Sequence, residues 1–257
     1  MNRRSFMLAA AGVLACPLCA KLNSRRALAA GDKPHWSYEG ASGPDSWGKL
    51  DRSYAACGRG AQQSPIDLSG AVRAEVDAGS IRWKPIKLGS IVNNGHTIQV
   101  NTPDGGHLEL DGFRYDLVQF HFHHMSEHTV DGKQFPMEVH FVHKAADGDG
   151  LAVVGVFLAA GSENAVLAPI WATMPEEEGE SSRDVSVDVK GLLPKSSAAF
   201  RYAGSLTTPP CSEVVAWTVL KEAVGASAGQ IAEFAKLFPG NFRPVQPLNR
   251  RFILYSG

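Results

Sequence analysis

The 257-residue sequence lacks an excess of charge of either sign, since 25 lysines and arginines face 26 aspartates and glutamates and the formal net charge is −1. A chain that binds nucleic acid usually carries a clear basic excess, so this composition gives no reason to expect a nucleic-acid partner. The sequence also lacks internal repeats, low-complexity tracts and any obvious linker. We therefore expect one large domain over residues 31–257.

The chain also lacks an apolar run of the roughly 20 residues that a membrane-spanning helix needs. Its N-terminal apolar stretch, Met7 to Ala20, is shorter than that and follows the basic pair Arg3-Arg4. Together with the small residues Ala27-Leu28-Ala29, this pattern is typical of a cleaved export signal. We predict such a signal over residues 1–30 and a periplasmic or secreted mature protein.

Two kinds of export signal fit these residues to different degrees. Arg3-Arg4 followed by Ser5-Phe6-Met7 resembles a twin-arginine signal, which carries folded cargo. Val13-Leu14-Ala15-Cys16 loosely resembles a lipoprotein cleavage site that would anchor the chain at Cys16, but Leu14 fits that pattern poorly. We therefore favour the twin-arginine route.

The most informative segment is Gln119–His123, which is followed after a polar loop by Glu138–His140. Side chains two apart on a strand point the same way, so His121 and His123 share one face. A second strand after the loop could bring His140 beside them. Three imidazoles facing one cavity indicate a catalytic metal site, whereas a lone histidine on a strand is more often an ordinary hydrogen-bonded residue.

Two neighbouring residues favour the metal interpretation for this trio over the chain's other histidines. Gln119 lies two residues before His121 and Glu138 two residues before His140, each on the same face as its histidine. An amide oxygen or a carboxylate there can accept the ring N–H that does not face the metal. The opposite face of the first strand is predicted to enter the core through Val118, Phe120 and Phe122.

The number of ligands narrows the chemistry. Three protein nitrogens leave one tetrahedral position of Zn²⁺ open for water, whereas four protein ligands would close a structural site. Neutral imidazoles leave the full charge on the metal, which lowers the pKa of a bound water toward neutrality. We therefore predict a catalytic site with one Zn²⁺ per chain, although imidazole ligands also accept cobalt or iron.

Eight ordered stretches extend this pattern over nearly the whole chain. They are His35–Tyr38, Gln63–Asp67, Asn93–His96, Gln119–His123, Ser126–Val130, Glu138–His140, Ser205–Pro210 and Arg243–Pro247. In these stretches the sequence resembles the α-class carbonic anhydrases, of the exported bacterial type, from His35 to Ile253.

The resemblance implies a zinc lyase that interconverts carbon dioxide and bicarbonate. His121, His123 and His140 would hold the zinc, and zinc-bound hydroxide would attack carbon dioxide to give bicarbonate and a proton. Activated esters would be side substrates. The expected partners are small molecules, without nucleic acid or a transmembrane span, and the chain would act as a monomer or homodimer.

By the same resemblance, Thr207 would orient the hydroxide and Glu127 would accept the proton of the Thr207 hydroxyl. A threonine hydroxyl has one proton to give, so a Thr207 that donates to Glu127 can only accept from the hydroxide. A lone pair of the hydroxide would then face the substrate carbon. Without the resemblance, Glu127 is an ordinary loop carboxylate and Thr207–Pro210 a rigid turn.

The predicted substrate pocket is an apolar recess that suits a small uncharged molecule. Val142 shares the face of His140. The family pattern adds Val153, Leu206, Thr208 and Trp217. Read without the resemblance, the apolar members of this set are simply core residues of buried strands.

Each turnover leaves a proton that must reach solvent, and His96 matches the proton-shuttle histidine of the family. An unperturbed histidine pKa of about 6.5 suits this task. Tyr38, Asn94 and Gln99 would line the water path, with Gln99 standing where many relatives have asparagine. The alternative interpretation of His96 is an exposed turn histidine.

Strand patterns dominate the rest of the sequence, and helices are few and short. Alternating or continuous apolar residues occur at Ile98/Val100, Leu108/Leu110, Val185/Val187/Val189, Leu151–Ala160 and Val214–Leu220. Ser227 and Gln230 form a capping box before an apolar helical face. The resemblance implies a mainly β fold: a large, twisted, mostly antiparallel sheet with short peripheral helices and the active site on central strands.

Cysteine is scarce, with four residues in the chain. Cys16 and Cys19 fall inside the predicted signal, which leaves Cys57 and Cys211 in the mature protein. An even count in an oxidising compartment favours a disulfide, and exported relatives bond the cysteines that match these two positions. Because Cys211 directly follows Thr207–Pro210, this bond would anchor the loop that orients the hydroxide.

Two other functions stay open at this point. One is a domain of this family that has lost catalysis and serves as a binding or structural module. The other is a periplasmic zinc-buffering protein, which would need the three histidines but not Thr207, Glu127 or an apolar pocket. The presence of Thr207 and Glu127 argues against both.

Overall fold

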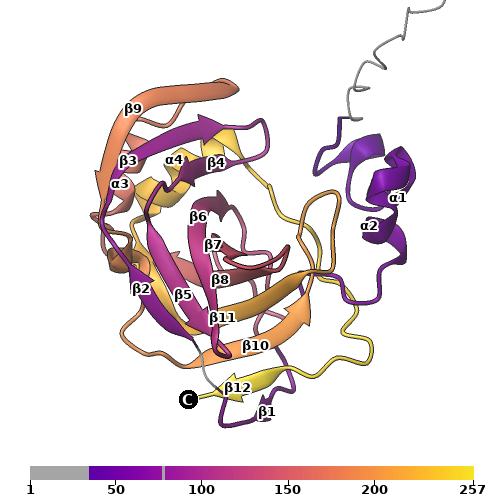
Figure 1. The fold of residues 1–257 in the computed structure, drawn as a ribbon. Helices are drawn as coiled ribbons and strands as arrows, with labels where there is room; N and C mark the ends of the chain where they lie inside the picture. The colour runs from indigo at the N-terminus through magenta and orange to yellow at the C-terminus, as the bar shows by residue number, and fades with distance from the viewer. Residues whose placement is uncertain (1–34, 77–78) are drawn as a thin grey trace, which may run out of the picture. The chain divides into compact units, whose positions relative to one another are not determined.

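Strands predominate in the computed structural model, which describes residues 35–76 and 79–257 (Figure 1). The strands are β1 (Val72–Arg73), β2 (Ser80–Trp83), β3 (Ile86–Asn93), β4 (Ile98–Asn101), β5 (Gly106–Leu110), β6 (Phe113–His123), β7 (Met137–Ala145), β8 (Leu151–Ala160), β9 (Gly179–Val187), β10 (Ala199–Gly204), β11 (Val215–Ala226) and β12 (Leu254–Ser256). The helices are α1 (Trp47–Leu50), α2 (Ala55–Arg59), α3 (Leu167–Trp171) and α4 (Ala228–Leu237), and 3-10 turns are η2 (Gly40–Ser42), η3 (Arg52–Tyr54) and η4 (Val189–Leu192). The predicted signal over residues 1–30 lies outside the described residues.

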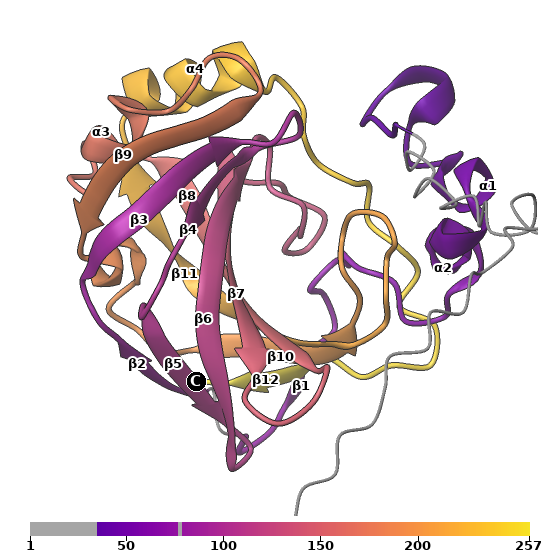
Figure 2. The same cartoon turned by 45° about the horizontal axis from the view of Figure 1, so that its top comes forward.

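These strands pair into one large sheet with β6, β7 and β8 near its middle. The order is β1-β12-β10-β11-β8-β7-β6-β4-β3-β9, and β5 joins β2 to β6. Most neighbours run antiparallel, while β1 and β12, and β8 and β11, run parallel. Figure 2 shows α3 and α4 beside β9, at the edge of the twisted sheet. The prediction of a mainly β fold with a large, mostly antiparallel sheet and short peripheral helices is confirmed.

The central strands divide their side chains between an apolar core and a polar face. Phe120 and Phe122 of β6 are fully buried in the larger core cluster, as the alternation predicts. The same prediction is wrong for Val118, which is 41% exposed. The pairing of β6 with β7 shifts register between Leu117 and Gln119, so the alternation breaks there and Leu117 enters the core instead.

Two sequence patterns at the edge of the sheet have different outcomes. The capping box is confirmed: Ser227 accepts a hydrogen bond from the backbone N–H of Gln230, whose side chain accepts from that of Ser227, and α4 follows. The strand predicted to reach Val189 ends at Val187 instead. The Asp188 side chain accepts from the backbone N–H of Lys190, which turns the chain into η4 at Val189.

The predicted disulfide between Cys57 and Cys211 is present and joins positions 154 residues apart. Both cysteines are buried in a small cluster with Trp47 and Tyr54 of the N-terminal segment. Closing so long a loop typically adds about 2–4 kcal/mol to stability. None of the helices in the described part of the chain is both long and apolar enough to cross a membrane.

His143 is a buried histidine on β7 whose two nitrogens are both occupied in the neutral form. Trp83 donates its indole N–H to Nε2 at 2.9 Å, and Nδ1 donates to the carbonyl of Ala152 at 3.2 Å. Burial lowers the pKa of His143 to about 4, outweighing its hydrogen bonds to the backbone and the charge of Asp116, while His107 adds to the lowering. A proton on Nε2 would remove the acceptor that Trp83 uses.

We predict that acid destabilises the protein through His143. The pKa of His143 in the folded state lies below its value in the unfolded state. The neutral ring therefore contributes up to about 3 kcal/mol of stability above pH ~6.5, and this contribution is lost as the pH falls toward ~4. Urea unfolding measured between pH 7.5 and 4 should therefore show a shallower pH dependence for His143→Gln than for the wild type. If the free energy of unfolding changed equally with pH in the two proteins, His143 would not be the cause of the acid destabilisation.

Candidate metal centre

Three histidine rings meet on the polar face of the central strands. β6 supplies His121 and His123, β7 supplies His140, and His121 lies directly opposite His140 in the strand pairing. The ring centroids are 5.1 Å apart for His121 and His123, 5.4 Å for His121 and His140, and 4.6 Å for His123 and His140. One nitrogen from each ring lies within 4.8 Å of those of the other two, which is a spacing that a single metal ion can bridge.

The other nitrogen of each ring donates to an oxygen that can only accept. His121 Nδ1 lies 2.9 Å from Gln119 Oε1, His123 Nδ1 lies 2.7 Å from the carbonyl of Asn241, and His140 Nε2 lies 2.9 Å from Glu138 Oε1. These acceptors place the ring hydrogen on the bonded nitrogen. In its neutral form, each ring therefore turns an unprotonated nitrogen toward the other two histidines. Burial opposes protonation of His140, but the charges of Glu138 and Glu127 outweigh it and raise its pKa.

The arrangement fits a divalent cation that prefers nitrogen ligands, such as Zn²⁺. His123 Nε2 is buried and has no hydrogen-bond partner among the described residues, which is costly unless an electrophile binds it. Burial, followed by the neighbouring histidines, holds the pKa of His121 well below its usual value. Burial likewise lowers the pKa of His123, so both rings are neutral and their lone pairs are available.

Glu138 is a fully buried carboxylate that accepts four hydrogen bonds. Its donors are His140 Nε2, His128 Nδ1 at 2.7 Å, and the backbone N–H groups of Glu127 and His128 at 2.9 Å. Burial alone would raise the pKa of Glu138, but His128 and His140 together hold it well below its usual value. These bonds also explain the close group His128, Glu138 and His140, whose ligand atoms are engaged with one another rather than with a metal.

A glycine opposite His140 makes room for this carboxylate. Gly155 of β8 pairs with His140, and a Cβ atom added to it would lie 2.9 Å from Glu138 Oε1. That oxygen is held by His128 and His140, so it cannot move aside without breaking their hydrogen bonds. The close approach therefore requires glycine.

Glu127 and Thr207 lie in buried positions, but the described residues show no hydrogen bond between them. Glu127 Oε1 accepts from the backbone N–H of Arg243 at 2.8 Å. Glu127 Oε2 is buried without a hydrogen-bond partner in the described part of the chain, 3.5 Å from His123 Nε2. Thr207 is 5% exposed. A carboxylate oxygen beside His123 and His140 is thus left available to a donor.

A narrow cavity of about 120 Å³ connects the histidines with the predicted proton path. It is lined by Trp36, Tyr38, Asn94, His96, Thr97, Gln99, Gln119, His121, His123 and Thr208. His96 stacks on Trp36 with 3.6 Å between ring centroids and an interplanar angle of 11°. Burial, and then His35, lowers the pKa of His96, while Glu178 opposes this shift.

The apolar residues predicted to form the substrate pocket lie next to the ligands but belong to the second core cluster. Val142, Val153 and Trp217 are consecutive partners across β7, β8 and β11 and are at most 8% exposed. Leu206 packs against the same cluster. Trp217 also lies 4.9 Å from the ring of His140, so this apolar row borders the centre.

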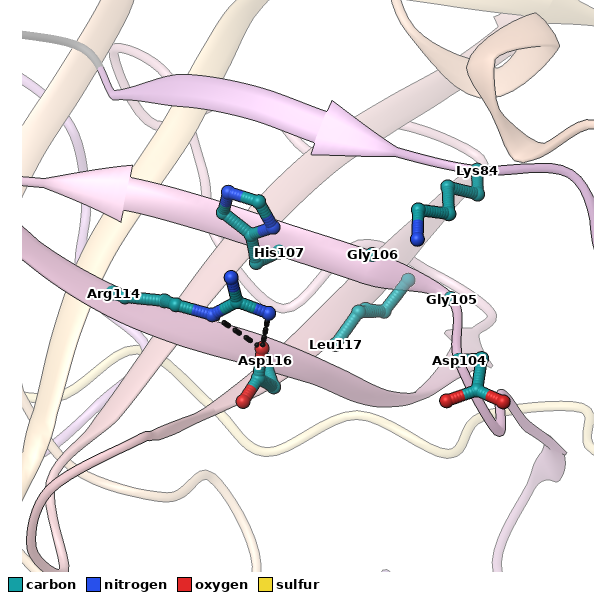
Figure 3. A pocket seen from close by; sticks show the side chains of 8 residues that line it. All are labelled: Lys84, Asp104, Gly105, Gly106, His107, Arg114, Asp116 and Leu117. Carbon is teal, nitrogen blue, oxygen red and sulfur yellow. Dashed lines mark hydrogen bonds and ion pairs between the residues drawn. The ribbon is translucent and has the colours of Figure 1, made fainter.

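A larger cavity of about 530 Å³ lies apart from these histidines, over the paired strands β5 and β6 and the loops beside them (Figure 3). Its charged side chains include both signs: Lys84 and Arg114, Asp104 and Asp116. Arg114 donates two hydrogen bonds to Asp116 Oδ1, at 2.9 and 2.7 Å. Neither of the two metal-compatible groups found in the described chain lies there, so the histidine centre is the better candidate.

Several contributors to the centre were not predicted from the sequence. Asn241 acts through its backbone carbonyl, which leaves no signal in the residue type. Trp36 was part of a recognised motif, but it stacks on His96, a residue 60 positions later in the chain, and only the fold brings the two rings together. His128 belonged to another such motif, and its place between Glu138 and Tyr202, whose hydroxyl lies 2.6 Å away, emerges only in the fold.

Comparisons with known proteins agree with this geometry. The profile of the eukaryotic-type carbonic anhydrase family matches residues 42–257. A carbonic anhydrase from Nostoc sp. is 45% identical over 86% of this chain and 85% of its own length, and one from Pectobacterium carotovorum is 44% identical over 87% and 92%. The structure of α-carbonic anhydrase from Thermovibrio ammonificans with the inhibitor sulfanilamide superimposes with a TM-score of 0.82, at 45% identity, covering 86% of this chain and 99% of that one.

We predict that Gly155→Ala weakens zinc binding by about 10- to 100-fold, because the new methyl displaces the carboxylate that orients His140. Overpacking should also lower the free energy of unfolding by about 1–3 kcal/mol. Competition with a chromogenic chelator measures the affinity, and urea unfolding measures the stability. Gly150→Ala is the matched control, since its Cβ would meet only the Cβ of Ala145 at 3.9 Å. Equal zinc affinity in the two variants would refute the role of Gly155.

Proposed function

Because this chain belongs to the eukaryotic-type carbonic anhydrase family, we propose that His121, His123 and His140 hold the zinc at which its reaction takes place. The protein is a zinc enzyme that reversibly hydrates carbon dioxide to bicarbonate and a proton. One observation carries the assignment of the ligands. In each of the three rings, one nitrogen donates a hydrogen bond to a neighbouring oxygen, which leaves the other nitrogen to bind the metal. All three come from one chain, so the predicted monomer or homodimer would have one complete site per chain.

Zinc bound by three neutral imidazoles acts as a Lewis acid that makes a hydroxide nucleophile available near neutral pH. The protein's own part is to orient that nucleophile. Thr207 would donate its proton to Glu127 Oε2, the buried oxygen that has no other hydrogen-bond partner among the described residues. The Thr207 oxygen can then only accept from the nucleophile's O–H, which turns a lone pair toward the substrate carbon.

Carbon dioxide is small and uncharged, so an apolar surface beside the nucleophile suffices to hold it. Val142, Val153 and Trp217 supply such a surface at the ligands, with Leu206 packed beside them. Thr208, which lines the cavity, would contact the polar side of the substrate or product. Esterase activity on activated esters would use the same nucleophile.

The proton released in each cycle would leave through the narrow cavity to His96. Tyr38, Asn94 and Gln99 line that cavity together with His121, which supports a chain of waters between the centre and His96. Stacking on Trp36 holds the half-buried imidazole of His96 in the lining of this cavity. Its lowered pKa favours handing the proton on to buffer.

The decisive experiment is stopped-flow hydration of carbon dioxide by the zinc-loaded mature protein. We expect turnover far above the uncatalysed rate in the wild type and its loss in His121→Ala, because two nitrogen ligands do not retain the metal in a catalytic geometry. Thr207→Val is the matched comparator, since it removes only a hydroxyl: it should keep the zinc and lose about 10²-fold or more in kcat/KM.

A wild type that holds zinc yet matches the uncatalysed rate would overturn the catalytic proposal and favour a binding module or a zinc-buffering protein. Metal content measured by atomic absorption separates these outcomes from simple loss of zinc. If Thr207→Val retained full activity, the orientation role of Thr207 and Glu127 would be wrong, while the assignment of the ligands would stand.

We further propose that the protein is exported, with cleavage of the N-terminal signal. The Cys57–Cys211 disulfide supports this proposal, because structural disulfides persist in oxidising compartments. The residues that would carry the signal, including Arg3-Arg4 and the rival site at Cys16, lie outside the described part of the chain.

Replacing Arg3-Arg4 by Lys-Lys should trap the protein in the cytoplasm, because the twin-arginine machinery reads the arginine pair. Cell fractionation with immunoblotting measures the distribution in a host that has this pathway. Cys16→Ser provides the comparison: it should leave export and solubility unchanged, whereas release from the membrane fraction would indicate a lipid anchor. Undiminished periplasmic protein in the Lys-Lys variant would rule out the twin-arginine route.

A further inference from the structure

Three polar side chains form a line that starts at the cavity and crosses from β4 to β3. Gln99, which lines the cavity, donates from Nε2 to Asn101 Oδ1 at 2.7 Å. Asn101 Nδ2 donates in turn to Ser90 Oγ at 3.0 Å. Ser90 and Asn101 are direct partners in the pairing of β3 with β4, and Gln99 is the partner of His121 in that of β4 with β6.

This line of bonds has one direction in the structure, with an amide nitrogen as the donor at each step. Asn101 is engaged at both ends, since its oxygen accepts from Gln99 and its nitrogen donates to Ser90. In this arrangement Gln99 Nε2 is directed along the strand toward Asn101. Gln99 Oε1 accepts no hydrogen bond from any described residue, so this oxygen is the group that the amide offers to water in the cavity.

Asn94, the other amide of the cavity, is held in the opposite sense. Its Oδ1 accepts from the backbone N–H groups of His96 at 3.0 Å and Thr97 at 2.9 Å. Only its Nδ2 is left for water, so Asn94 serves the cavity as a donor while Gln99 serves it as an acceptor. Tyr38 stays protonated, because burial and then the charge of Glu127 raise its pKa well above the usual value.

We infer that Asn101 and Ser90 are positioning residues for proton transfer: by holding Gln99 as an acceptor opposite the donor Asn94, they orient the water between the metal centre and His96. This inference rests on the proposed function. A proton moves along a chain of water molecules only when each molecule donates to the next. A fixed donor on one side of the cavity and a fixed acceptor on the other therefore reduce the reorientation of water that precedes proton transfer.

The inference predicts a specific kinetic signature for Asn101→Leu in the zinc-loaded enzyme. Removing the acceptor frees the Gln99 amide to rotate, so kcat, which includes proton release, should fall by about two- to tenfold, the worth of one hydrogen bond. The kcat/KM for carbon dioxide should stay unchanged, because attack precedes this proton transfer. Imidazole buffer should restore kcat by carrying the proton directly. Asn101→Asp keeps an acceptor for Gln99 Nε2 and should stay closer to the wild type.

A double-mutant cycle tests whether Asn101 acts through Gln99. Gln99→Leu and Gln99→Leu/Asn101→Leu should have the same kcat, since the second change has nothing left to position. His96→Ala, which should lower kcat with rescue by imidazole, tests the proton path itself. If His96→Ala lowers kcat but Asn101→Leu does not, the proposed function stands and the inference is wrong. Equal falls of kcat and kcat/KM in Asn101→Leu would also overturn it.

A measurement on the zinc-free protein gives an independent readout. In ¹⁵N-labelled protein, the side-chain amide of Gln99 has two N–H resonances, and one belongs to the hydrogen bond with Asn101. Asn101→Leu should move that resonance and speed its exchange with water, while Ser90→Ala should have a smaller effect of the same kind. An unchanged pair of Gln99 resonances in Asn101→Leu would show that Asn101 does not hold the amide, whatever the kinetics.

Discussion

The metal centre depends on the hydrogen bonds of one buried carboxylate. A carboxylate as completely buried as Glu138 would be costly without partners, and here four N–H groups surround it. Two of these come from the backbone of the loop that carries Glu127, and one comes from His140, a proposed ligand. Glu138 therefore orients His140 and also shapes the loop whose own carboxylate, Glu127, approaches His123.

The two faces of the central strands serve different purposes because neighbouring side chains point to opposite sides. On β6, Phe120 and Phe122 pack into the core while His121 and His123 turn to the cavity. A ring set in such a strand has little freedom, since the backbone on both sides is bonded to neighbouring strands. The rigidity of the core is thus passed directly to the ligands. Gly155 shows how tightly the next strand must fit against them.

Much of this arrangement could be predicted from the sequence, and the omissions have a common cause. The spacing of His121 and His123, and of each of Gln119 and Glu138 from its histidine, follows from the period of a strand. The capping box at Ser227 is equally local. By contrast, the carbonyl of Asn241 reaches His123 from 118 positions away. Val118 was misplaced because a register shift between strands is a property of the pair and leaves no mark in either sequence.

The sequence by itself determined the histidine cluster, the strand faces except at Val118 and, through its ordered motifs, the family and its reaction. Tertiary structure alone decided how the polar groups connect: the four donors on Glu138, the stacking of His96 on Trp36, and the opposite senses in which Asn94 and Gln99 are held. The reason is physical. Periodicity determines which side of a strand a residue occupies, whereas hydrogen-bond direction depends on partners that only the folded chain brings within 3 Å or so.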